Sequence, residues 1–228
     1  MALSKEIIQK VINYCNRDLV PDKQYITKKK GVLFPSEWFE SYFSFLNNKL
    51  LEKNLGEAFY QARFLYKIMS ALNLPFAKHK AFLRFQIIQY ASICEAILES
   101  VIERFYKNEF QNKYAINEYA VCKNATSKET KILFEGKPLY LCKIKKKKAD
   151  IKRERIDHKT EFAVEHGIIS PESKKQFDQL YDSRNNIHIL KAINNNYRPQ
   201  VKEAKNAFKI MQRFASEVKS YYIKHNIN

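Results

Sequence analysis

The sequence predicts an all-α protein that carries one small inserted β-hairpin. Its 228 residues include only four Gly and six Pro, which suits long helices better than a turn-rich sandwich of strands. Apolar residues recur at steps of three and four over several long segments, as on one face of an amphipathic helix. Apolar residues make up 45% of the chain, so we expect a packed globule rather than a disordered tail.

Residues 1–76 are expected to form an N-terminal helical extension. Residues 17–31 have the composition of a loop, and a densely aromatic second helix is expected to begin at Ser36 as its N-cap. Gly56 is expected to separate this helix from a third. The first helix has one apolar face, formed by Leu3, Ile7, Ile8, Val11, Ile12 and Cys15.

Residues 77–228 are expected to form a helical bundle. The first of its helices is apolar on two sides, which places it in the middle of the bundle. The last repeats apolar residues at steps of three and four from Val201 to Tyr222, which is typical of a packed seam. The four expected helices cover about 79–110, 149–166, 171–191 and 200–224.

Helix-capping residues mark the boundary between the second and third of these helices. Gly167 is expected to cap the C-terminus of the second helix. Ser170 is a suitable N-cap for the third, and Pro171 fits its first position.

The helical period disappears between the first two bundle helices. Residues 132–134 and 139–141 are apolar and flank a Gly-containing turn, which predicts a β-hairpin inserted at about 130–144. A two-stranded hairpin is marginally stable alone, so we expect it to pack on the helices or on a partner.

The chain is strongly basic, with a formal net charge of +17. Such an excess favours a polyanionic partner, with nucleic acid ahead of an acidic membrane surface. Between Lys137 and Lys159 there are ten basic and three acidic residues. The alternative is a solvated basic loop with no partner. The candidate phosphate-binding residues are Lys143, Lys145, Lys146, Lys147, Lys148, Lys152, Arg153 and Arg155.

Several other classes of protein are not favoured by the sequence. There is no uninterrupted apolar run of about 18 residues and no signal peptide, so we expect a cytoplasmic protein without a membrane span. The four cysteines lack zinc-site spacing, and Cys15 and Cys94 fall on apolar helix faces as reduced, structural thiols would. No Gly-rich phosphate loop or cluster of metal-binding carboxylates is visible, so no metal or cofactor is expected.

A candidate site lies in the third bundle helix. Its inward face, marked by Phe177, Leu180 and Tyr181, continues at helical spacing into Arg184 and His188. An unpaired buried charge is costly, so these two residues are expected to line a crevice or an interface. They are four residues apart and share one side of the helix if it is unbroken. The alternative is a packed or solvated His without chemistry.

Arg184, Asn185 and His188, late in a predicted bundle, resemble the signature of the HEPN superfamily (higher eukaryotes and prokaryotes nucleotide-binding domains). The family motif is an Arg, usually followed by a polar residue, and then a His after four to six intervening residues; here three residues intervene. The resemblance covers about 77–228. It implies an antiparallel four-helix bundle, and many members of the superfamily are metal-independent ribonucleases of toxin, anti-phage and RNA-processing systems.

Glu95 interrupts an apolar stripe of the first bundle helix. An inward carboxylate needs a partner, and Arg184 across the bundle is the candidate. An acidic residue in this helix also resembles HEPN sequences, in which it helps to organise the site. The alternative is that Glu95 reaches solvent at the rim of the bundle.

These residues provide what metal-free RNA cleavage needs. His188 would act as general base or acid, Arg184 would clamp the phosphate, and Asn185 would orient the substrate or a partner motif. The product would be a 2′,3′-cyclic phosphate, and DNA would be spared because it lacks the 2′-hydroxyl. The resemblance also implies a homodimer, and a toxic nuclease would need an antitoxin or defence-system partner.

The competing hypothesis is a non-catalytic module. It would bind RNA, a nucleotide or another protein, and the Arg, Asn and His would only brace the helices. A DNA-binding regulator is less favoured, because no helix-turn-helix pattern is apparent.

Overall fold

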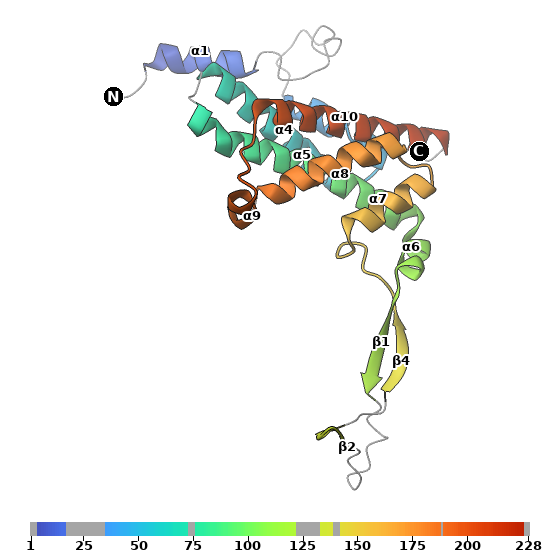
Figure 1. Ribbon diagram of the computed structural model, residues 1–228. Coiled ribbons are helices and arrows are strands. Elements are labelled where there is room, and N and C mark those ends of the chain that lie inside the picture. Colours follow the sequence, from blue (N-terminus) through green and yellow to red (C-terminus); the bar gives the residue numbers. More distant parts are fainter. Residues whose placement is uncertain are drawn as a thin grey trace. The chain divides into compact units, whose positions relative to one another are not determined.

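The computed structural model of the chain is mostly helical (Figure 1). Its described residues fall into two compact units: a helical unit within Met1–Ser100 and Ile156–Asn228, and an inserted unit within Val101–Arg155. The mostly helical fold with a small antiparallel insertion is confirmed. The inserted unit is longer than the expected 130–144. The structure describes residues 4–16, 35–72, 76–121, 133–138, 142–187 and 189–225.

The helical unit contains most of the helices. Among its described elements are α1 (Lys5–Asn16), α3 (Pro35–Ser41), the 3-10 helix η1 (Ser44–Leu46), α4 (Lys49–Ala71), α5 (Phe76–Phe105, up to Ser100), α7 (Ile156–Glu165), α8 (Pro171–Asn186), α9 (Ile189–Asn194) and α10 (Val201–Lys224).

An aromatic cluster joins α4, α5 and α10. Phe59, Tyr90 and Phe208 come from these three helices, and their ring centroids lie 5.7–6.3 Å apart. The guanidinium of Arg63 lies 4.7 Å from the centroid of the Phe208 ring. Because α4 shares this core, part of the expected N-terminal extension packs into the same unit as α5 and α10.

The helix α10 packs along α8, as Figure 1 shows. Phe177 of α8 and Phe214 of α10 meet with ring centroids 5.2 Å apart. The predicted seam of the last helix is confirmed, because its apolar face is buried. The buried residues of α10 are Ala204, Ala207, Met211, Phe214, Ala215, Val218, Tyr221 and Tyr222.

The predicted break at Gly56 is wrong, because α4 runs through this residue. The preceding break falls at Asn47, whose φ of 51° is left-handed, and Asn48 caps α4 by accepting a hydrogen bond from the Leu51 amide. Gly56 has a packing role instead: a Cβ there would lie 2.8 Å from the backbone nitrogen of Glu40. Glycine therefore lets α3 and α4 approach closely.

Two helix starts also differ from the predictions. The helix α3 begins at Pro35, so Ser36 lies inside its first turn rather than at the N-cap. The helix α7 begins at Ile156 rather than near residue 149, so the basic residues from Lys152 to Arg155 precede it in turns.

The predicted boundary between α7 and α8 is confirmed. Gly167 adopts a φ of 64°, and the Ile168 amide donates a 2.8 Å hydrogen bond to the Ala163 carbonyl, which forms a Schellman cap. Ser170 caps α8 by accepting a hydrogen bond from the Ser173 amide.

The inserted unit contains a short hairpin at the predicted place and a second pair of strands that was not predicted. The second strand of the hairpin is Lys137–Pro138, which was predicted as part of the turn, and the predicted strand 139–141 lies outside the described residues. The hairpin turn, Glu135–Gly136, has positive φ at both residues, as a type I′ turn requires. The strands β1 (Ile116–Val121) and β4 (Cys142–Lys147) pair antiparallel, so most of the lysine run, for which no strand was predicted, belongs to a strand. The elements of the unit after α5, which ends at Phe105, are α6 (Lys107–Lys113), β1 (Ile116–Val121), β2 (Leu133–Phe134), β3 (Lys137–Pro138) and β4 (Cys142–Lys147).

By length and composition, one segment of the described residues, Lys80–Phe105 of α5, is apolar enough to cross a membrane. More than half of its most apolar window is buried inside the protein. This is the expected property of a helix at the centre of a core.

A carboxylate of α10 ties the start of α8 to the core. Glu217 accepts hydrogen bonds from the Ser170 amide at 2.8 Å and from the Ser173 hydroxyl at 2.6 Å. Arg213 adds a charged donor at 3.2 Å. Burial alone would raise the pKa of Glu217, but these hydrogen bonds outweigh it and hold the pKa below its usual value.

We expect Glu217→Gln to lower the free energy of unfolding by about 1–3 kcal/mol at pH 7. A lowered folded-state pKa stabilises above the unfolded pKa of about 4.3, and this stabilisation is lost as the pH falls through the folded value. The difference between parent and variant in urea denaturation should therefore shrink at pH 3. The exposed Glu161→Gln on α7 is the control, and an equal loss in both variants would contradict the role of Glu217.

Candidate functional site

The predicted helix from 171 to 191 is wrong at its C-terminal end. The helix α8 ends at Asn186, with Ile187 as the C-cap, and α9 begins at Ile189. The side-chain amide of Asn195 donates a 2.9 Å hydrogen bond to that of Asn186, which holds this connection. His188 lies outside the described residues, so its predicted place on the same helix face as Arg184 stays a prediction.

Arg184 lies in the last turn of α8, and the predicted partnership with Glu95 is confirmed. The guanidinium nitrogen Nη2 is 3.7 Å from Oε2 of Glu95 on α5. The two side chains are 28% and 23% exposed. The separation makes this an ion pair longer than a hydrogen bond, so Glu95 orients the guanidinium while the side chain keeps its access to solvent.

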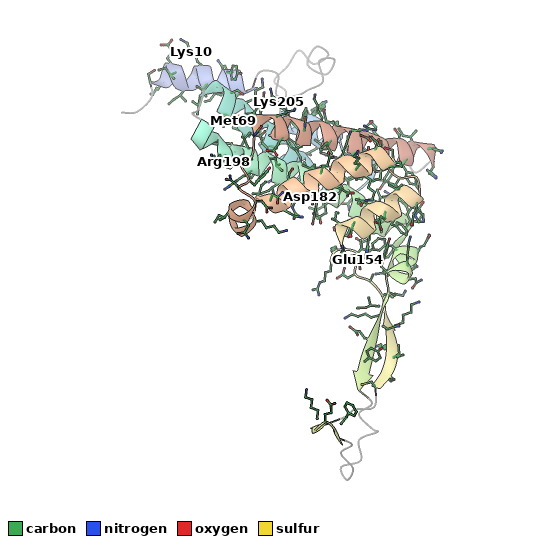
Figure 2. All side chains as sticks on the ribbon, in the orientation of Figure 1. Lys10, Met69, Glu154, Asp182, Arg198 and Lys205 are labelled. Carbon is green, nitrogen blue, oxygen red and sulfur yellow. The ribbon has the colours of Figure 1, made fainter. Side chains whose placement is uncertain are left out.

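The ring of Tyr181 forms a second support for Arg184. Its centroid lies 4.9 Å from Cζ of the guanidinium, one helical turn away on α8. We call Glu95, Tyr181 and Arg184 the Arg184 cluster. Asn185 beside it is partly exposed, whereas Asp182, labelled in Figure 2, lies on the exposed side of α8.

Tyr197 lies at the same end of α8 and was not predicted. It belongs to the connection between α9 and α10, and its hydroxyl faces Ser183 of α8 and Glu203 of α10. Burial, aided by the charge of Glu203, raises the pKa of Tyr197 to about 12. The residue is therefore a neutral phenol at physiological pH, and Arg84 of α5 lies close enough to oppose part of this shift.

A second ion pair, which was not predicted, lies one helical turn along α5. Glu99 pairs with Lys159 of α7, and only 1% of the Lys159 side chain is exposed. The same side of α5 therefore presents two carboxylates, one to a cation of α8 and one to a cation of α7. A buried charge of this kind persists only when it is paired.

The predicted phosphate-binding residues are exposed. Those from Lys143 to Lys147 lie on β4, and Lys148, Lys152, Arg153 and Arg155 follow it. Two of them are partly neutralised, because Lys147 pairs with Glu118 and Arg153 with Asp150. All eight belong to the inserted unit, whereas the Arg184 cluster belongs to the helical unit.

Two of the three described cysteines, Cys15 and Cys94, fit the predicted structural role, whereas Cys142 on β4 is exposed. Cys15 and Cys94 are buried, and burial raises the pKa of both. A buried neutral thiol is unreactive. Within the described ranges, no three side chains of His, Cys, Asp or Glu come together as metal ligands would.

Comparison of the chain with protein-family models, curated proteins and solved structures finds no match.

The Glu95–Arg184 ion pair can be measured by a double-mutant cycle. We expect Glu95→Gln, Arg184→Gln and the double variant to yield a coupling free energy of about 1 kcal/mol in urea denaturation, because both side chains are mostly buried. The exposed pair Glu6–Lys10 on α1 is the matched control and should show a smaller coupling. Equal coupling in the two cycles would contradict an organising role for Glu95.

Proposed function

We propose that the chain is a HEPN-like, metal-independent endoribonuclease of a toxin or anti-phage type, acting in the cytoplasm as a homodimer. The observation that carries the proposal is the contact between Glu95 and Arg184. It joins the Arg of the motif to the acidic residue of the first bundle helix, and these are the two positions that the resemblance to HEPN sequences had selected.

The proposed fold is an antiparallel four-helix bundle of α5, α7, α8 and α10. Ion pairs link α5 to α8 through Arg184 and to α7 through Lys159. Ring contacts link α10 to α8 through Phe214 and to α5 through Phe208. In Figure 1, α8 runs in the direction opposite to both α5 and α10.

In the proposed mechanism, Arg184 binds the scissile phosphate. A guanidinium keeps its charge at every physiological pH and matches two phosphate oxygens at once. Glu95 and Tyr181 hold this group in place before the substrate arrives, so little reorganisation is needed when negative charge develops on the phosphorane.

His188 is the proposed proton carrier. Its imidazole takes the proton of the 2′-hydroxyl, and the resulting oxygen attacks the neighbouring phosphorus. The bond from phosphorus to the 5′-oxygen breaks, and a second copy of the motif, contributed by the other subunit, donates a proton to this oxygen. The products are a 2′,3′-cyclic phosphate and a 5′-hydroxyl. Asn185 would help to orient the substrate.

A second candidate function is a non-catalytic module that binds RNA, a nucleotide or a protein. The short spacing between Arg184 and His188 in the sequence favours it, because three residues intervene where the family motif has four to six. In this case the ion pair of Arg184 with Glu95 braces α8 against α5 and has no substrate.

The two functions differ in one experiment on the purified full-length chain. Incubated with total RNA in EDTA at low and high salt, the nuclease should release fragments ending in 2′,3′-cyclic phosphate. The module should instead give a salt-sensitive gel shift without cleavage.

We expect Arg184→Ala and His188→Ala each to lower the cleavage rate by about 100-fold or more, since each removes charge stabilisation or proton transfer. Arg184→Lys should also impair cleavage, because an ammonium group cannot bind phosphate bidentately. Arg198→Ala, an exposed arginine labelled in Figure 2, is the matched control and should cut at the parent rate. Parent-like cleavage by Arg184→Ala would remove the assignment.

A further inference from the structure

The register of the β1–β4 ribbon sorts its side chains onto two faces. Residues directly opposite each other on paired strands point to the same face, and successive residues point to opposite faces. One face, which we call the lysine face, contains the pairs Ile116–Lys147, Glu118–Lys145 and Ala120–Lys143. The other, which we call the aromatic face, contains the pairs Asn117–Lys146 and Tyr119–Ile144, and Cys142.

The aromatic face exposes a large apolar pair. Tyr119 and Ile144 lie directly opposite each other and are 73% and 64% exposed. Two exposed apolar side chains of this size, side by side on a two-stranded ribbon, form a candidate contact surface.

The neighbouring residues indicate what the partner is. The pair Asn117–Lys146 lies next to Tyr119–Ile144 on the same face, so a cation and an amide flank the aromatic ring. The four lysines of β4 face a single carboxylate on β1, that of Glu118. A flat aromatic ring beside a cation complements a base and its phosphate.

The lysine face would attract a polyanion through its charge, but it offers fewer groups for specific contact with a base. Glu118 pairs with Lys147 and lies across from Lys145, so part of the charge on this face is neutralised within the ribbon. It also lacks an exposed aromatic ring. The aromatic face is therefore the better candidate for specific contact.

We propose that the aromatic face of the β1–β4 ribbon binds single-stranded RNA. Tyr119 stacks on an unpaired base, Ile144 packs beside that base, and Lys146 contacts the adjacent phosphate. Bases of an A-form duplex are stacked inside the helix and cannot reach Tyr119, so unpaired RNA is preferred. The inference rests on the proposed function for its choice of RNA, but the ribbon and the Arg184 cluster share no residue.

The test is fluorescence anisotropy of a labelled 12-nucleotide oligo-uridine RNA with the full-length chain carrying His188→Ala, in EDTA. We expect Tyr119→Ala to weaken binding by about tenfold or more, the usual loss for one stacked base. Tyr119→Phe should bind within about twofold of the parent, because the ring remains. Lys146→Ala should reduce the slope of log affinity against log salt by about 0.7, the loss of one phosphate contact.

Phe134→Ala is the matched control, since Phe134 is an exposed aromatic residue of the same unit but lies on the β2–β3 hairpin. It should keep parent affinity. The proposal is overturned if Tyr119→Ala binds like the parent, if Phe134→Ala weakens binding equally, or if an RNA duplex of the same length binds as tightly as the single strand. A Tyr119→Ala chain that keeps its RNA affinity but changes mass in light scattering assigns this face to a protein partner and also overturns it.

Binding and cleavage fail separately in this design. If the chain cuts no RNA but binds it through Tyr119, the proposed ribonuclease activity is wrong and the proposed RNA-binding face stands. If Tyr119→Ala leaves both the cleavage rate and the RNA affinity unchanged, the proposed RNA-binding face is wrong and the proposed ribonuclease activity stands.

Discussion

Two carboxylates on a buried helix constrain the arrangement of the helical unit. The helix α5 is apolar around most of its circumference, so Glu95 and Glu99 must meet cations supplied by the helices that cover them. Arg184 meets one and Lys159 meets the other. Sliding α8 or α7 by one turn would leave a charge unpaired in the core, and that cost fixes the register of both helices. Of the two cations, Lys159 is buried and Arg184 is partly exposed, so Arg184 is the one that can reach an anion.

Helix boundaries could be predicted from the sequence where they depend on interactions between neighbouring residues. The start of α8 follows from a capping serine and a proline, and the end of α7 follows from Gly167. The pairing of Glu95 with Arg184 could also be predicted, because each interrupts an apolar stripe of its helix and an inward charge needs a partner. Their meeting required only that the two stripes face each other.

The remaining features depend on segments that are distant in the sequence. The role of Gly56 requires the backbone at Glu40, and the lysine run becomes a strand only because β1 pairs with it. A run of lysines has little intrinsic preference for a strand, so its composition did not predict one. Tyr197 carries no periodic signal because it lies in a connection. The end of α8 at Asn186 reflects the low helix propensity of consecutive asparagines, which an apolar pattern does not report.

The ribbon also bears on the solubility of the protein. Each strand of a two-stranded sheet leaves one edge of peptide groups unpaired, and such edges can recruit further strands into fibrous aggregates. The lysines that alternate along β4 repel a second ribbon and act as gatekeepers against this association. The charge to which we assign RNA binding thus also protects the free protein from self-assembly.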